Sequence, residues 1–357
     1  MDESFDEAYN RDLLTEELHG GSVDGGGGGG DYDDDDGEDA AASDSSDFSS
    51  VSGEGIPPIR EYGHSYHGSG RMVIPNDACE NERQRIQHEL FTFVLGGNLT
   101  FTKLHLKLLS PQMAPYHILD VGCGGGHWAM ALAQKHPLAN VLGIELSGAN
   151  LPVKVPPNLT FEIADAAAEW PPALYDFIHM RNLIGGGIRD WRKLIHDAWA
   201  HIKPGGHIEF TELTPLFFGV DPDTQPGAPG EGDDAQQPQA TVGMGAACSE
   251  YLAHFSVACQ SQGLDFDPIP KVGPWLLELG AEGLRQRSDF MPLRPWANDP
   301  IIRKKGEIVS KMMPAAAVHW TYRLFAKTGH DEEYTRDLVT RVIDEMQDPT
   351  LKACVQV

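Results

Sequence analysis

The central part of the chain alternates short apolar runs with longer segments whose apolar residues recur at helical spacing. The short runs predict five strands, at 117–121, 141–146, 159–163, 175–180 and 207–212. Helical spacing between them predicts helices over 127–136 and 189–202. Strands that alternate with helices in this way imply a parallel sheet with helices on both faces, so we expect an α/β fold of the Rossmann-like type.

The segments on either side of this region have helical patterns. An Asn76 or Asp77 cap followed by spaced apolar residues predicts a helix over 77–95. Further helices are predicted over 245–262, 271–281, 299–327 and 331–347, with Pro314 kinking the third. Two late runs are expected to be strands, 283–291 and 351–357, the last one cut short by the chain end.

Two segments show no periodicity, and they set the expected domain boundaries. Residues 1–58, with six consecutive glycines and an acidic run, bury too little apolar surface to offset chain entropy, so we expect a disordered tail. The second segment, the Pro/Gly-rich stretch 219–243, is either a mobile lid on the ligand side or a neutral insertion. The predicted domain at 59–357 has a helical lead-in (59–112), a core (113–215), this flexible insert (219–243) and a helical substrate-side part (244–357).

Charge and cysteine content exclude several classes of protein. The formal net charge is −26, and residues 1–60 alone hold 18 acidic against 2 basic side chains. This acidic head is a solvating tail or a docking arm for a basic partner, and the chain lacks the basic patch that nucleic acid requires. No apolar run reaches membrane-spanning length, so we expect no membrane attachment. Five cysteines without metal or disulfide spacing predict no metal site and a reducing compartment, the cytoplasm or the nucleus.

The most informative chemistry lies where the first strand of the predicted sheet ends. Asp120 is followed by Gly122, Gly124 and Gly126, and a helix begins directly after them. Glycines allow a tight turn and let backbone N–H groups approach a ligand, and the helix N-terminus adds a positive dipole end. A carboxylate at Asp120 would repel a pyrophosphate but suits a cationic amino-acid tail. S-adenosylmethionine has such a tail and no phosphate.

Two more acids follow the next two predicted strands. Glu145 ends the second strand, at the position where a ribose diol is held. Asp165, followed by Ala166, comes after the third strand and can accept a hydrogen bond from an adenine amino group. With the glycine loop, these acids favour S-adenosylmethionine as cofactor over a dinucleotide or a purely structural turn.

Methyl transfer from a sulfonium needs chiefly positioning, and a general base only where the acceptor is protonated. Candidate bases are His179 at the end of the fourth strand, and Tyr66 and His67 in the lead-in. Each is weak, because a structural role is favoured for each: a core histidine for His179, a packing residue for Tyr66 and a surface residue for His67. Arg181 either contacts a substrate carboxylate or, as we expect, pairs with Asp190.

Several motifs together resemble the fungal LaeA-like (TAM-domain type) class I methyltransferases. They lie at 62–67, 119–128, 161–166, 177–181, 188–191 and 201–206. The resemblance covers about residues 60–357 and implies a seven-stranded sheet of order 3-2-1-4-5-7-6 with the last strand antiparallel. It also implies that Gly122, Gly124 and Gly126 line the donor, that Glu145 holds the ribose, and that Asp165 and Ala166 lie by the adenine. Family members commonly have Asp where this chain has Glu145.

The resemblance implies two functions that the residues do not separate. The first is an S-adenosylmethionine-dependent methyltransferase of fungal secondary metabolism that methylates a small molecule. The second is a nuclear regulator of metabolite genes that acts in a complex with velvet-type transcription factors, to which the acidic tail would dock.

Overall fold

A computed structural model of the chain describes residues 56–104, 115–168, 170–214, 217–219 and 245–357. Of the predicted acidic tail only residues 56–58 belong to this set, and of the predicted insert at 219–243 only Gly219 does. Both expectations therefore lie almost wholly outside the described residues.

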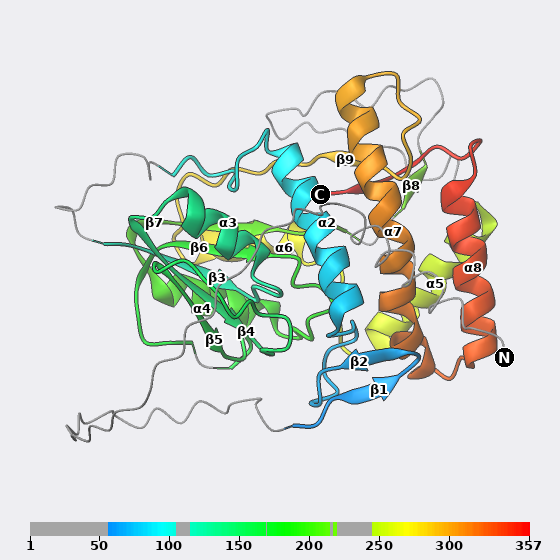
Figure 1. The fold of residues 1–357 in the computed structure, drawn as a ribbon, viewed down its shortest axis with the longest axis horizontal. Helices are drawn as coiled ribbons and strands as arrows, with labels where there is room; N and C mark the ends of the chain where they lie inside the picture. Colours follow the sequence, from blue (N-terminus) through cyan, green and yellow to red (C-terminus); the bar gives the residue numbers. More distant parts are fainter. Residues whose placement is uncertain (1–55, 105–114, 169, 215–216, 220–244) are drawn as a thin grey trace, which may run out of the picture. The chain divides into compact units, whose positions relative to one another are not determined.

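The centre of the fold is a sheet of five parallel strands (Figure 1). These are β3 (Tyr116–Val121), β4 (Ala139–Glu145), β5 (Leu159–Ile163), β6 (Tyr175–Arg181) and β7 (Ile202–Thr211). Their order is β5-β4-β3-β6-β7, so the chain winds outward in both directions from β3. The five strands predicted from apolar runs are confirmed, and the crevice at the carboxyl ends of β3 and β6 is where ligands bind in open α/β sheets.

Helices cover both faces of this sheet, as the alternation of apolar residues predicts. On β3, Ile118 packs with helix α3 (His127–Lys135), whereas Leu119 on the opposite face packs with helices α4 (Trp191–His201) and α6 (Ile269–Glu278). The side chains of Ile118 and Leu119 are both fully buried. Successive strand residues point to opposite faces, so a strand buried on both faces is apolar throughout. The Rossmann-like α/β fold is confirmed.

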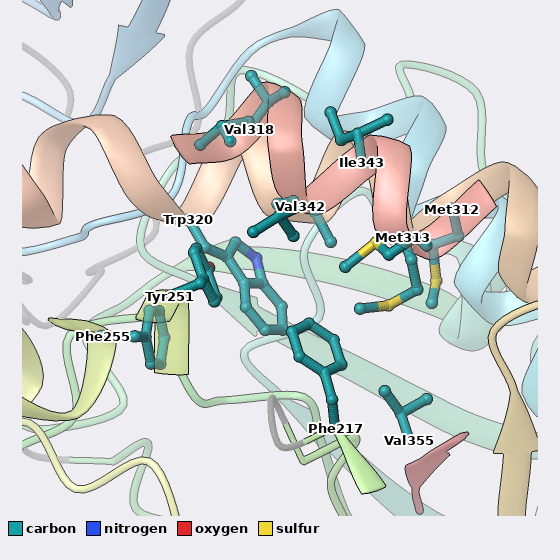
Figure 2. Close-up of a cluster of buried hydrophobic side chains, with 14 of the residues drawn as sticks. Phe217, Tyr251, Phe255, Met312, Met313, Val318, Trp320, Val342, Ile343 and Val355 are labelled. Carbon is teal, nitrogen blue, oxygen red and sulfur yellow. The ribbon is translucent and has the colours of Figure 1, made fainter. Parts of the chain in front are cut away.

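The remaining helices form a second layer beside the sheet. Helix α7 (Pro300–Ala326) packs against α2 (Ala78–Val94), α5 (Ala246–Ser261) and α8 (Glu332–Gln347) (Figure 1). Helix α7 runs through Pro314 without a break and is buried over most of its length. Figure 2 shows the apolar cluster at its centre, where Trp320 lies among Phe217, Tyr251 and Val342. These helix boundaries agree with the sequence predictions within two residues, and α2 begins at an Asp77 cap that accepts the Glu80 N–H.

The last strands do not extend the central sheet into a continuous seven-stranded one. Strands β8 (Phe218–Gly219), β10 (Ala353–Gln356) and β9 (Phe290–Pro292) form a separate antiparallel sheet in that order. Beyond β7, the Leu213 N–H donates to the side-chain oxygen of Asn182, which follows β6 (3.1 Å). Thr214 bridges the two sheets, because its N–H (2.8 Å) and its hydroxyl (3.1 Å) both donate to the Gln356 carbonyl. Strand β10 still lies between β8, which follows β7 in the chain, and β9. This is the expected order, and β10 is antiparallel to both neighbours.

A short hairpin of β1 (Ile59–Glu61) and β2 (His64–Tyr66) precedes α2. Within the described ranges, no helix combines the length and apolar character needed to cross a bilayer.

Candidate active site

A cavity opens at the carboxyl ends of all five strands of the central sheet. Its wall combines the turn after each strand with one side of α2, the segment before α2 and a single residue of α7. The lining side chains and turns include Gly122–Gly124, Glu145–Ser147, Ala164–Ala166, Arg181–Ile184, Glu212, Leu213, Arg71, Arg83, Gln84, Gln87, His88 and Trp320. The topology therefore brings segments from most of the described chain to one site.

The glycine loop after β3 is shaped by conformations and contacts that only glycine accommodates. Gly124 has a φ of +57°, and a Cβ there would lie 2.5 Å from the Gln84 side chain of α2. Gly126, with a φ of +73°, precedes α3, and a Cβ there would lie 2.5 Å from the Phe161 ring. The loop is therefore held tightly between α2 and β5, with Gly122–Gly124 at the cavity.

Glu145 lies at the end of β4, directly opposite the glycine loop. One carboxylate oxygen accepts the Gly124 N–H and the other accepts the Leu146 N–H, both at 2.8 Å. Burial raises the pKa of Glu145, and these backbone N–H groups oppose the rise. A carboxylate oxygen can accept more than one hydrogen bond, so Glu145 can also accept hydroxyl groups from the cavity side.

The two residues predicted at the next strand end, Asp165 and Ala166, both line the cavity. Asp165 accepts the Ala167 N–H (2.9 Å) and a hydrogen bond from Arg71 (2.6 Å). Burial opposes the ionisation of Asp165, but these two partners outweigh it and lower the pKa. Arg71 was not predicted as a site residue, because the sequence gives no sign that a residue 94 positions earlier meets this acid.

Asp120 lies beneath the glycine loop and is buried. Its Oδ1 is 2.7 Å from His179 Nδ1, whereas nothing in the described part of the chain hydrogen-bonds to its Oδ2. A buried acceptor without a partner is costly, but Asp120 is not among the described residues that line the cavity.

The three predicted bases each have a partner within the protein, and none of them lines the cavity. The His179 ring stacks on Trp128 at 3.7 Å between centroids and is fully buried. Tyr66 is buried under the Arg323 guanidinium, 4.8 Å from its ring centroid, and burial raises its pKa. His67 is 2.9 Å from the Ser69 hydroxyl, and burial lowers its pKa. None of these three residues is among the described residues that line the cavity.

Arg181 does not pair with Asp190, so that prediction is wrong. Asp190 instead caps α4 by accepting the Lys193 N–H (2.9 Å), because the first turn of a helix leaves N–H groups unsatisfied. Arg181 lines the cavity, donates to His88 Nδ1 (3.2 Å) and lies over the Phe91 ring.

Glu212, directly after β7, is a cavity residue that the sequence did not identify. Its side chain is 1% exposed and accepts the Leu183 N–H (2.6 Å) and the Ile184 N–H (3.5 Å). Burial raises its pKa to about 8, although the two N–H groups act in the opposite direction. An acid that follows an apolar strand at the ligand edge was the available signal, the same signal that identified Glu145.

A buried polar network fixes the wall that α2 contributes. Glu80 receives two hydrogen bonds from Arg83 (2.7 and 2.8 Å) and lies 2.7 Å from His319 of α7. His319 in turn meets the edge of His64, which is 2.8 Å from Asp77. Burial opposes ionisation of Glu80, but Arg83 and His319 lower its pKa to about 2. The network joins α2, α7 and β2, and so positions Arg83 at the cavity.

Comparison with known proteins agrees with this geometry. Residues 86–256 match a methyltransferase-domain family. Over 290 residues the chain is 29% identical to methyltransferase pytC of Aspergillus terreus, with 80% of this chain and 81% of pytC covered. Over 159 residues it is 36% identical to the secondary metabolism regulator LAE1 of Cochliobolus heterostrophus, with 43% of this chain and 50% of LAE1 covered.

Among solved structures, a phosphoethanolamine N-methyltransferase 2 of Haemonchus contortus in complex with S-adenosyl-L-methionine is similar at a TM-score of 0.37 and 16% identity. The alignment covers 70% of this chain and 49% of that one.

The network around Glu80 predicts a contrast between two arginines of α2 that each pair with a glutamate three residues earlier. Arg83→Ala leaves the buried Glu80 carboxylate short of its main counter-charge, and breaking such a pair costs about 3–5 kcal/mol of unfolding free energy. Arg85→Ala breaks an exposed pair with Glu82 and should cost less than about 1 kcal/mol. Urea unfolding of both variants at pH 7 measures the difference.

The same contrast should depend on pH with a defined sign. Because the pKa of Glu80 is lower in the folded protein than in the unfolded chain, its pairing stabilises the fold at pH values above the unfolded-state pKa. This contribution is lost as the pH falls toward about 2. The gap between the two variants should therefore narrow on acidification. Equal costs at pH 7, or a gap that does not change with pH, would contradict the role given to Arg83.

Proposed function

The chain contains a class I, S-adenosylmethionine-dependent methyltransferase domain, and we propose that it methylates a small molecule in fungal secondary metabolism. The observation that carries this proposal is the pairing of the Gly124 N–H with the Glu145 carboxylate across one end of the cavity. That arrangement places backbone donors and a diol-binding acid on the same ligand surface. Methylation by this chain would be an in-line transfer from the donor's sulfonium.

We place the donor at the end of the cavity formed by β3, β4 and β5. Gly122, Gly124 and Gly126 let the backbone approach it, and Glu145 accepts from the ribose hydroxyls. Asp165 and Ala166 flank the adenine, where Arg71 fixes the Asp165 carboxylate. The unpartnered Oδ2 of Asp120 supports a role for this acid toward the cationic end of the donor. The residues present therefore fit the cofactor.

A small acceptor is supported by how the cavity is enclosed. Side chains of α2 press onto the glycine loop, where Asn81 and Gln84 leave no room for a Cβ on Gly125 or Gly124. Apolar side chains such as Met72, Ile74 and Trp320 form much of the remaining wall. A recessed cavity in which apolar side chains alternate with polar and charged groups held at fixed positions suits a small molecule.

The donor site predicts a specific loss when the Glu145 charge is removed. Glu145→Gln keeps the size of the side chain but weakens a charge-assisted bond to the ribose, which is worth about 1.5–3 kcal/mol, or roughly 10- to 150-fold in Kd. Glu162→Gln is the matched control, because Glu162 lies on the neighbouring strand and is exposed. Isothermal titration of the full chain with S-adenosylmethionine measures both. A wild-type chain that does not bind, or equal affinities for the two variants, would contradict the proposal.

A second function is supported by the match to LAE1, which carries the name of a regulator. We propose as the alternative that the chain acts in the nucleus with a velvet-type protein, and that the acidic residues before position 60 dock to a basic surface of that partner.

The docking proposal is tested with a full-length chain in which Asp33–Asp36 are replaced by Asn. Charge attraction between exposed surfaces should make the capture of a velvet-type protein by the wild-type chain stronger at low salt and weaker in the variant. Capture that is independent of both salt and the substitutions would argue against the acidic docking arm, and no capture at all would remove the regulatory alternative.

A further inference from the structure

We propose that Glu212 is the catalytic base of the methyl transfer and that the acceptor is a phenol with an apolar body. In this proposal Glu212 removes the phenolic proton, and Arg181 stabilises the negative charge that develops on the oxygen. The inference rests on the proposed function, because it assumes that the donor occupies the other end of the same cavity.

The position of the two residues places them at the acceptor end. The order β5-β4-β3-β6-β7 separates the donor residues, which follow β3, β4 and β5, from those that follow β6 and β7. Arg181 ends β6 and pairs in register with Thr211, the last residue of β7, and Glu212 comes next. Arg181 and Glu212 therefore stand on neighbouring strand ends, and both line the cavity.

Glu212 is a buried carboxyl whose only hydrogen bonds in the described part of the chain are to backbone N–H groups. The Leu183 N–H binds one oxygen at 2.6 Å, whereas the second oxygen has only the Ile184 N–H at 3.5 Å. No described cation pairs with it, in contrast to the equally buried Glu80, which has Arg83 and His319. Burial therefore dominates, and a pKa of about 8 lets Glu212 exchange a proton near neutral pH.

Arg181 supplies a positive charge that lies near Asp120 and Glu209 but forms no direct ion pair with a described residue. Its hydrogen-bond partner His88 stays neutral, because burial and the nearby charge of Arg181 lower the His88 pKa to about 3. No carboxylate of the described residues forms an ion pair with Arg181, since Asp120 is engaged with His179 and Glu209 with the N–H groups of Phe101 and Thr102. A partly buried guanidinium at a cavity wall favours an anionic oxygen.

These two groups together select the acceptor chemistry. A phenol has a pKa near 10, as in tyrosine, so a base with a pKa of about 8 is well matched to its proton. An aliphatic alcohol is far less acidic, and a carboxylic acid is already ionised and needs no base. A protonated amine would be repelled by Arg181. Phenol is the class that uses both Glu212 and Arg181.

A second, much smaller cavity adjoins the first, and the residues that the two share form an apolar part of the wall of the first cavity. Ile184, Ile188 and Trp320 line both cavities. Beyond them the second cavity is walled by apolar side chains that include Phe255, Phe266 and Leu324. Figure 2 shows Trp320 and Phe255 extending from different helices toward the same region. On the side of the first cavity, the shared aromatic and aliphatic wall suits a planar apolar ring.

The step balances as follows. The Glu212 carboxylate takes the phenolic proton while an oxygen lone pair forms a bond to the donor's methyl carbon. The bond from that carbon to sulfur breaks, and sulfur keeps the electron pair, which leaves a neutral thioether. The products are an aryl methyl ether, S-adenosylhomocysteine and a protonated Glu212, which then loses its proton to solvent.

The test compares Glu212→Gln with Glu209→Gln, two buried acids on or beside the same strand, of which only Glu212 lines the cavity. The probe acceptor is 1-naphthol, with 1-naphthylamine and 1-naphthalenemethanol as amine and alcohol of similar size. In the full chain, E212Q should lower the rate of 1-methoxynaphthalene formation by about 10²–10⁴-fold and abolish the rise of that rate through pH about 8. E209Q should keep both the rate and the pH profile.

Two readouts do not depend on turnover. Calorimetry should give E212Q and E209Q the same affinity for S-adenosylmethionine. Infrared difference spectra during a pH titration should show a protonated-carboxyl band that disappears through pH about 8 in E209Q and is absent from E212Q.

The outcomes separate the two proposals. A wild-type chain that does not bind the donor overturns the proposed function itself. Donor binding with an unchanged rate and pH profile in E212Q overturns the role of Glu212 as base. A loss of donor affinity in E212Q without a change in pH profile would instead assign Glu212 to the donor's positive charge. Methylation of the amine or the alcohol but not of 1-naphthol, or of none of the three, overturns the phenol assignment.

Discussion

The site depends on the hydrogen bond between the Gly124 N–H and the Glu145 carboxylate. It joins the turn after β3 to the end of β4, and it forms only because the loop is free of side chains on both sides. On one side Gln84 of α2 fills the space that a Cβ on Gly124 would need, and on the other Phe161 does so for Gly126. The sheet, the loop and α2 are thereby held at fixed distances, and the cavity between them has a defined shape.

The negative charges of the buried carboxyl groups around this cavity are stabilised by different partners, and each set of partners suits a different role. Glu80 has Arg83 and His319 as partners and serves to lock α2 to α7. Among the described residues, Asp120 has one histidine partner and one oxygen without a partner. In the same part of the chain, Glu212 has only backbone donors, so its charge is held least firmly. A low-dielectric interior makes such differences large, because an unpaired buried charge costs far more than a paired one.

Most of the fold was predictable from the sequence because the apolar pattern of each element is strong. The alternation of strands and helices fixed the parallel sheet, and the parallel direction alone brings Gly124, Glu145 and Asp165 to one edge. The continuous seven-stranded sheet was not obtained, because β8, β10 and β9 pair in a sheet of their own beyond the end of β7. The point at which one ladder ends and the next begins leaves no periodic signal in the apolar pattern.

The site itself was predictable only in part. Residues that follow strands were found from their place in the pattern, but Arg71 and the polar side of α2 reach the cavity through packing between distant segments. The predicted ion pair between Arg181 and Asp190 is wrong, because Asp190 caps its own helix by accepting the Lys193 N–H. His179 stands at a strand end as predicted, but the alternation of β6 turns its ring toward Trp128 in the core. Charge and spacing identify candidates, whereas the direction of a side chain depends on the packed structure.

A crystal structure of the chain with S-adenosylhomocysteine tests the central claim most directly. The account predicts the ribose hydroxyls on the Glu145 carboxylate, the adenine beside Asp165 and Ala166, and the sulfur facing the end of the cavity that holds Arg181 and Glu212. Density for the ligand elsewhere, or a ribose that does not contact Glu145, would contradict it.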